Sequence, residues 1–166
     1  MIEEGSSFII EGKPDEAFGS LTGEAYDAAV AGNALRAGKR QSTVPRRVEL
    51  LSERLFGRTL DDAVRGLRYQ LLYSAAAALA DAAERKAIAA VFIVQELHSP
   101  GLDSRKLRQN AEDWAAFLWM FSGTDEKRQK LLDTLIGPAT PARMEWRDVP
   151  LYFAKVITNI ASPDAR

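Results

Sequence analysis

The sequence predicts a single α/β domain in which a small central mixed sheet is flanked by helices. Two runs of β-branched and aromatic residues, at residues 8–10 and 90–94, have the composition of buried strands. Around them lie segments whose apolar residues recur at the spacing of amphipathic helices. A length of 166 residues is usual for one domain, and no composition break divides the chain. We therefore expect residues 1–166 to form one domain.

The first strand is predicted to carry polar groups at its carboxyl end. The run Phe8-Ile9-Ile10 leads directly into Glu11-Gly12-Lys13-Pro14, so a buried strand becomes charged and is then stopped by proline. In α/β proteins the carboxyl ends of the strands usually hold the functional groups. Glu11 and Lys13 are therefore the first candidate site residues.

Three helical segments are expected between the two strands. Residues 24–36 have a mixed pattern compatible with a helix. A second helix is predicted to begin at Pro45 and to end at Gly57, the preferred positions of these residues at helix ends. The clearest pattern is Thr59–Arg85, which predicts one long helix with a threonine and an aspartate at capping-box spacing at its start.

The second half of the chain continues the α/β pattern. Residues 89–96 are apolar on both faces, which is typical of a central strand covered on both sides. A helix capped by Asp103 or Ser104 is predicted to run to Phe121, and a shorter one to span residues 125–136. Residues 144–146 and 151–158 are interpreted as two final strands, a hairpin being one arrangement.

The composition excludes several classes of function. The 22 basic and 23 acidic side chains nearly cancel, so a nucleic-acid site would have to be a local patch. The absence of cysteine excludes disulfides, thiolate zinc sites and a cysteine nucleophile, and the single histidine, His98, argues against a histidine-dependent triad. The amino-terminal residues do not resemble a signal peptide, and the longest apolar run, residues 74–83, is shorter than the about 20 residues that span a bilayer. The expected protein is soluble and cytoplasmic, with no membrane partner.

Glu11 and Lys13 form a pattern suited to metal-assisted phosphodiester hydrolysis. Two residues apart on a strand, their side chains leave the same face. The carboxylate would bind Mg²⁺ or Mn²⁺, and the ammonium would stabilise the attacking water or the charge that grows on the phosphate. This spacing alone is common by chance, and an exposed ion pair at a strand end is the alternative.

A second polar group interrupts the long helix at Arg68-Tyr69-Gln70-Leu71-Leu72-Tyr73. A buried or cleft-lining glutamine at position 70 would need hydrogen-bond partners. The alternative is that Gln70 faces solvent and that the two tyrosines are residues at the edge of the core.

Together these segments resemble the core of the PD-(D/E)XK nuclease-like (restriction-endonuclease-like) superfamily, in which an E-x-K strand is followed by a helix that carries glutamine and tyrosine. The chain is more closely similar to a family of bacterial proteins related to that superfamily, which carries EGKxDExFG and RYQLL motifs. The matching segments are Glu11-Gly12-Lys13-Pro14-Asp15-Glu16-Ala17-Phe18-Gly19 and Arg68-Tyr69-Gln70-Leu71-Leu72, and the resemblance extends over residues 10–158.

The resemblance implies a role for each matching residue. Glu11 corresponds to the metal-binding carboxylate, Lys13 to the catalytic lysine, and Gln70 to the helix glutamine that supports the metal site. Glu16 and Arg68 are expected to contact the substrate or, as an alternative, to brace the loop. Further substrate contacts are expected from Tyr73, Arg40 and Arg46. The last two belong to the basic stretch 36–47, whose phosphate contacts would be independent of sequence. A solvated loop is the other interpretation of that stretch.

The chain departs from the superfamily pattern before its first strand. The superfamily's metal site also uses an acidic residue from an earlier strand, whereas only seven residues precede Phe8 here, with Glu3 and Glu4 as the acids. This departure implies either a truncated amino terminus or the loss of half the site. Two functions are therefore expected as alternatives: a Mg²⁺-dependent nuclease acting on DNA or RNA, and a catalytically inactive binding module of the same fold. An unpaired strand at the shortened edge of the sheet would also favour a homo-oligomer.

Overall fold

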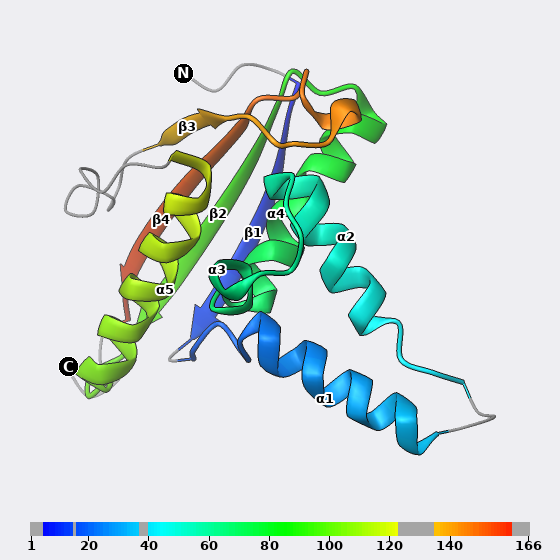
Figure 1. Ribbon diagram of the computed structural model, residues 1–166. Helices are drawn as coiled ribbons and strands as arrows, with labels where there is room; N and C mark the ends of the chain where they lie inside the picture. Colours follow the sequence, from blue (N-terminus) through cyan, green and yellow to red (C-terminus); the bar gives the residue numbers. More distant parts are fainter. Residues whose placement is uncertain (1–4, 15, 37–39, 123–134, 161–166) are drawn as a thin grey trace.

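The computed structural model describes residues 5–14, 16–36, 40–122 and 135–160. They form one four-stranded sheet with the order β1-β2-β4-β3. Strands β1 (Ser6–Pro14), β2 (Ala89–His98) and β4 (Leu151–Asn159) are parallel, and β3 (Ile136–Ala139) is antiparallel to β4. With helices packed on this mixed sheet (Figure 1), the predicted α/β fold class is confirmed.

Helices α1 (Thr22–Leu35) and α2 (Val44–Phe56) form an arm that extends away from the sheet (Figure 1). The connection between them is held by Asn33, whose side chain accepts a hydrogen bond from the Ser42 N–H at 2.6 Å and donates one to the Ser42 carbonyl at 3.0 Å. The predicted ends of α2 are confirmed, because Pro45 lies in its first turn and Gly57 ends it in the left-handed conformation with φ 66°.

The prediction of one long helix over residues 59–85 is wrong. The segment contains α3 (Asp62–Arg65) and α4 (Tyr69–Arg85), and α3 is capped by the Asp61 carboxylate, which accepts from the Val64 N–H at 3.1 Å. The helix breaks because the Leu67 carbonyl accepts hydrogen bonds from a residue outside this segment. It accepts hydrogen bonds from both the backbone N–H of Thr22, at 2.7 Å, and its hydroxyl, at 2.9 Å.

The core lies between the sheet and helices α4 and α5 (Ser104–Ser122), and α5 has nearly the predicted bounds. Phe92 of the central strand packs edge-on against Trp114 and Phe117 of α5 and against Phe153 of β4. On the opposite face of the sheet Phe8 is 44% exposed and Ile10 is 60% exposed, so strand β1 is less buried than predicted.

The last strand was predicted, but its partner was not. Residues 144–146 form a short 3₁₀ helix, η2 (Met144–Trp146), whereas β3 pairs with β4. Gly137 allows this pairing, because its φ is 141° and a Cβ there would lie 2.8 Å from the Leu151 carbonyl oxygen. Most of the helix predicted at 125–136 falls outside the described residues, and Ile136 itself lies in a strand.

Candidate functional site

The Glu11 carboxylate links strand β1 to helix α4. The side-chain amide of Gln70 donates a hydrogen bond to its Oε1, and the Ser74 hydroxyl donates one to its Oε2 at 3.0 Å. Gln70 and Ser74 are one helical turn apart and therefore lie on the same face of α4. The structure thus brings together two residues that the sequence singled out, Glu11 and Gln70, although 59 positions separate them.

A second contact holds the amino-terminal part of β1 against the carboxyl-terminal half of α4. The Ser7 hydroxyl donates to the Asp81 carboxylate, which also accepts from Arg85 Nε at 2.8 Å. These two hydrogen bonds, that of Ser7 being the larger cause, lower the pKa of Asp81 below its ordinary value. Ser7 and Glu11 are both on the helix-facing side of β1, because they are four positions apart and side chains alternate along a strand.

Glu96 of β2 is a buried carboxylate that the sequence analysis did not identify. Its Oε1 lies 2.7 Å from Lys155 Nζ of β4, with both side chains under 5% exposed, and its Oε2 lies 3.1 Å from His98 Nε2. The backbone of Lys13 is paired in register with Glu96, so both positions lie at the carboxyl ends of parallel strands. The Lys13 side chain is outside the described residues. Charged residues within otherwise apolar strands were the available sequence signal for this pair.

Arg68 braces the loop before α1. It stands at the N-cap of α4, where its Nε lies 2.7 Å from Asp113 Oδ2 of α5 and its Nη1 donates to the Gly19 carbonyl at 2.7 Å. Gln109 donates to the other oxygen of Asp113 at 3.0 Å. These contacts support the bracing role for Arg68 over substrate contact.

The other predicted substrate contacts are exposed. The backbone carbonyl of Glu16 accepts a hydrogen bond from Asn110 Nδ2 at 3.0 Å, and its side chain is exposed. Arg40 and Arg46 lie on the α1–α2 arm, the first in the connection and the second in the first turn of α2. The described contacts do not join these three residues to Glu11.

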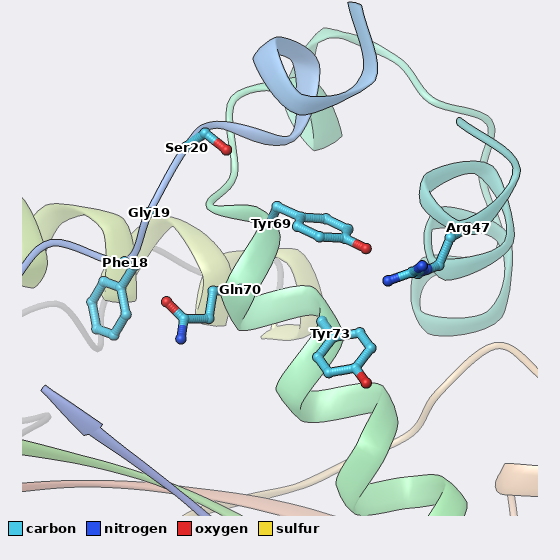
Figure 2. A pocket seen from close by; sticks show the side chains of 7 residues that line it. All are labelled: Phe18, Gly19, Ser20, Arg47, Tyr69, Gln70 and Tyr73. Atoms are coloured by element: carbon cyan, nitrogen blue, oxygen red, sulfur yellow. The ribbon is translucent and has the colours of Figure 1, made fainter. Parts of the chain in front are cut away.

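A pocket of about 330 Å³ opens beside Gln70, between the amino-terminal halves of α2 and α4 (Figure 2). Tyr73, one of the predicted residues, lines it with its ring half exposed. Arg47 and Tyr69 were not predicted as site residues, although Arg47 belongs to the basic stretch and Tyr69 to the RYQLL motif. The full lining is Phe18, Gly19, Ser20, Arg47, Tyr69, Gln70 and Tyr73.

The described residues do not form a closed metal site around Glu11. Within the described ranges, no three or more side chains of the ligating types are grouped so that they could hold a metal ion. Mg²⁺ often binds through one or two carboxylates, several waters and the substrate phosphate. Glu11 supplies one carboxylate, whose two oxygens accept the hydrogen bonds from Gln70 and Ser74.

Fold and site together define an α/β domain with a polar site at the carboxyl ends of parallel strands. The chain belongs to the family described as domain of unknown function DUF6946, whose model matches residues 3–160. No curated protein and no solved structure matches the chain. None of the helices in the described segments is both long and apolar enough to cross a membrane.

Proposed function

We propose that this chain is a PD-(D/E)XK-type domain that hydrolyses phosphodiester bonds of DNA or RNA with Mg²⁺ or Mn²⁺. The observation that supports this proposal is the hydrogen bond between Glu11 and Gln70. It joins the E-x-K strand to the helix glutamine at the sheet edge where α/β proteins usually hold their functional groups. An accidental strand-end ion pair would not require this contact between distant parts of the chain.

Each residue has a definite task under this proposal. Glu11 holds the cation, while Gln70 and Ser74 fix the orientation of its carboxylate through their hydrogen bonds. The ammonium of Lys13 stabilises the negative charge that develops on the phosphate. A bound Mg²⁺ supplies Lewis acidity and makes a coordinated water more acidic.

Cleavage of linear DNA, supercoiled DNA and RNA by the full chain, with Mg²⁺ or Mn²⁺, tests the proposal. We expect cutting that EDTA abolishes and that Glu11→Gln and Lys13→Ala each reduce by roughly a hundredfold or more. Glu84→Gln and Lys106→Ala, at exposed positions on α4 and α5, are the matched controls and should cut normally. Cutting that survives in Lys13→Ala at the wild-type rate would refute the proposal.

The second candidate is a catalytically inactive domain that binds nucleic acid or another partner. The observation in its favour is that Glu96, the buried carboxylate on the neighbouring strand, is neutralised by Lys155 at 2.7 Å. Among the described residues, no group of three or more His, Cys, Asp or Glu side chains could hold a metal ion. Binding of nucleic acid by folded protein that never cuts it, with either metal, would support this candidate over the nuclease.

A further inference from the structure

The pocket beside Gln70 has two polar groups that face one another across its opening. Figure 2 shows the Tyr69 hydroxyl and the Arg47 guanidinium pointing toward each other from α4 and α2. The Tyr69 oxygen is buried and has no hydrogen-bond partner among the described residues. The one hydrogen bond described for the Arg47 guanidinium is to the Thr43 hydroxyl, at 3.3 Å.

We propose that this pocket binds one nucleoside phosphate, either as the end of a nucleic-acid strand or as a free nucleotide. Its phosphate would accept hydrogen bonds from Arg47 and from the Tyr69 hydroxyl. Arginine is well suited to phosphate, because its guanidinium presents several donors in one plane. A buried hydroxyl normally has a partner, and a phosphate oxygen supplies one at Tyr69.

The base has an aromatic surface to occupy. The Tyr73 ring is 51% exposed and lies 6.4 Å, centroid to centroid, from the ring of Tyr69. Exposed tyrosine rings stack on bases with little dependence on sequence. The buried Phe18 adds apolar lining, and a volume of about 330 Å³ is in the range of small-molecule sites.

The position of the pocket connects it to the site at Glu11. Gln70 lines the pocket and also donates to the Glu11 carboxylate, so one side chain touches both. The exposed Arg40 and Arg46 lie on the same arm as Arg47 and extend the positive charge away from the pocket. A strand end bound here would have further phosphates near the arm. Cleavage of a strand bound here would rest on the proposed function, whereas binding itself does not.

Binding is measured with the full chain in EDTA, so that cleavage plays no part in the result. The probes are a short 5′-phosphorylated single-stranded oligonucleotide, the same strand without the phosphate, a nucleoside 5′-monophosphate and inorganic phosphate. Calorimetric titration gives an affinity for each. The variants are Arg47→Ala, Tyr69→Phe and Tyr73→Leu, with Arg108→Ala, at an exposed position on α5, as the matched control.

We expect Arg47→Ala to weaken binding of the phosphorylated strand by roughly tenfold or more, and binding of the unphosphorylated strand by less. Tyr73→Leu should weaken both strands, since it removes the stacking surface. Tyr69→Phe should weaken the phosphorylated strand while leaving the thermal midpoint unchanged or higher, because a buried unpaired hydroxyl is removed. For Tyr69→Phe, measuring both the affinity and the thermal midpoint distinguishes a ligand contact from a structural role.

Each outcome decides the inference. A phosphorylated strand that binds more tightly than the mononucleotide identifies the strand end as the ligand, and equal affinities identify the free nucleotide. Binding of inorganic phosphate alone, or affinities that the three pocket variants leave unchanged, would overturn the inference. Binding with the expected losses but no cleavage in the nuclease assay retains the pocket and rejects the proposed function. Cleavage at the wild-type rate in all three pocket variants retains the proposed function and rejects the pocket.

Discussion

At the scale of single residues, buried charged side chains in the described part of the chain form close ion pairs. Glu96 and Lys155 are both under 5% exposed and lie 2.7 Å apart, and Arg68 and Asp113 form a second, largely buried pair at 2.7 Å. Burying a charge without a partner is costly, whereas burying a well-placed pair is nearly neutral. These four residues are therefore better understood as mutually dependent than as independent sources of stability.

Removing one member of the buried pair should be far more damaging than removing both. We expect Lys155→Met to lower the free energy of unfolding by about 3–5 kcal/mol, because the Glu96 carboxylate is left buried without its cation. The double variant that adds Glu96→Leu should recover most of this loss. Urea denaturation of the purified proteins measures both changes.

The exposed pair Arg105–Asp103 provides the matched control. Its side chains are 86% and 38% exposed, so Arg105→Met should change the free energy of unfolding by about 0–1 kcal/mol. Similar losses in Lys155→Met and Arg105→Met would show that the interior pair is not buried as described.

At the scale of secondary-structure elements, helix ends are set partly by local chemistry and partly by neighbours. The end of α2 is local, because Gly57 adopts a left-handed conformation that other residues seldom adopt. The break between α3 and α4 is not local, since it depends on the hydrogen bonds that the Leu67 carbonyl accepts from Thr22, 45 positions away. The same break lets α4 begin at Tyr69, so that Tyr69 and Gln70 lie in its first turn.

Two glycine-to-alanine substitutions should have opposite effects on stability. Gly57→Ala should cost about 1–2 kcal/mol, because φ is 66° and the new Cβ would lie 3.0 Å from the Ala142 Cβ. Gly32→Ala should instead stabilise by roughly 0.5–1 kcal/mol, since Gly32 is inside α1 and the space around its Cβ position is open. Thermal or urea denaturation gives both values, and effects of the same sign would contradict the assignment of these two helices.

At the scale of the whole molecule, β1 forms one edge of the sheet in the described part of the chain, and its face away from the helices is partly exposed. In the described part of the chain, β1 is hydrogen-bonded to a strand on one side only. Phe8 and Ile10 of this strand are 44% and 60% exposed on the face away from the helices. An apolar strand at the edge of a sheet is a template for pairing with another strand.

We expect two copies of the chain to associate through the β1 edge. Light scattering should give a mass that rises with protein concentration, and Ile10→Lys should return the protein to the monomer, because charged side chains disfavour edge pairing. Val30→Lys, at a 44% exposed apolar position on α1, is the control and should leave the association intact. A constant monomer mass for the wild-type chain would refute this expectation.

Much of the fold could be predicted because the relevant signals are local. The β-branched runs around Ile9 and Phe92 identify β1 and β2, and the spacing of aromatic residues identifies α5. Proline and glycine mark the ends of α2 through their own backbone preferences. These features depend on residues within a few positions of one another, so the sequence by itself is enough to determine them.

The remaining features arise between distant segments. Residues 136–139 form a strand because β4 supplies hydrogen-bond partners, and no local β pattern predicts this strand. Glu96 and Lys155 meet because β2 and β4 are neighbours, and Arg47 and Tyr69 line one pocket because α2 packs beside α4. Local residue patterns and the motif resemblance both selected Glu11 and Gln70, but their contact, and the pocket next to it, depend on where folding places α4 against β1. Local preferences therefore determined the elements, and tertiary packing decided which side chains meet.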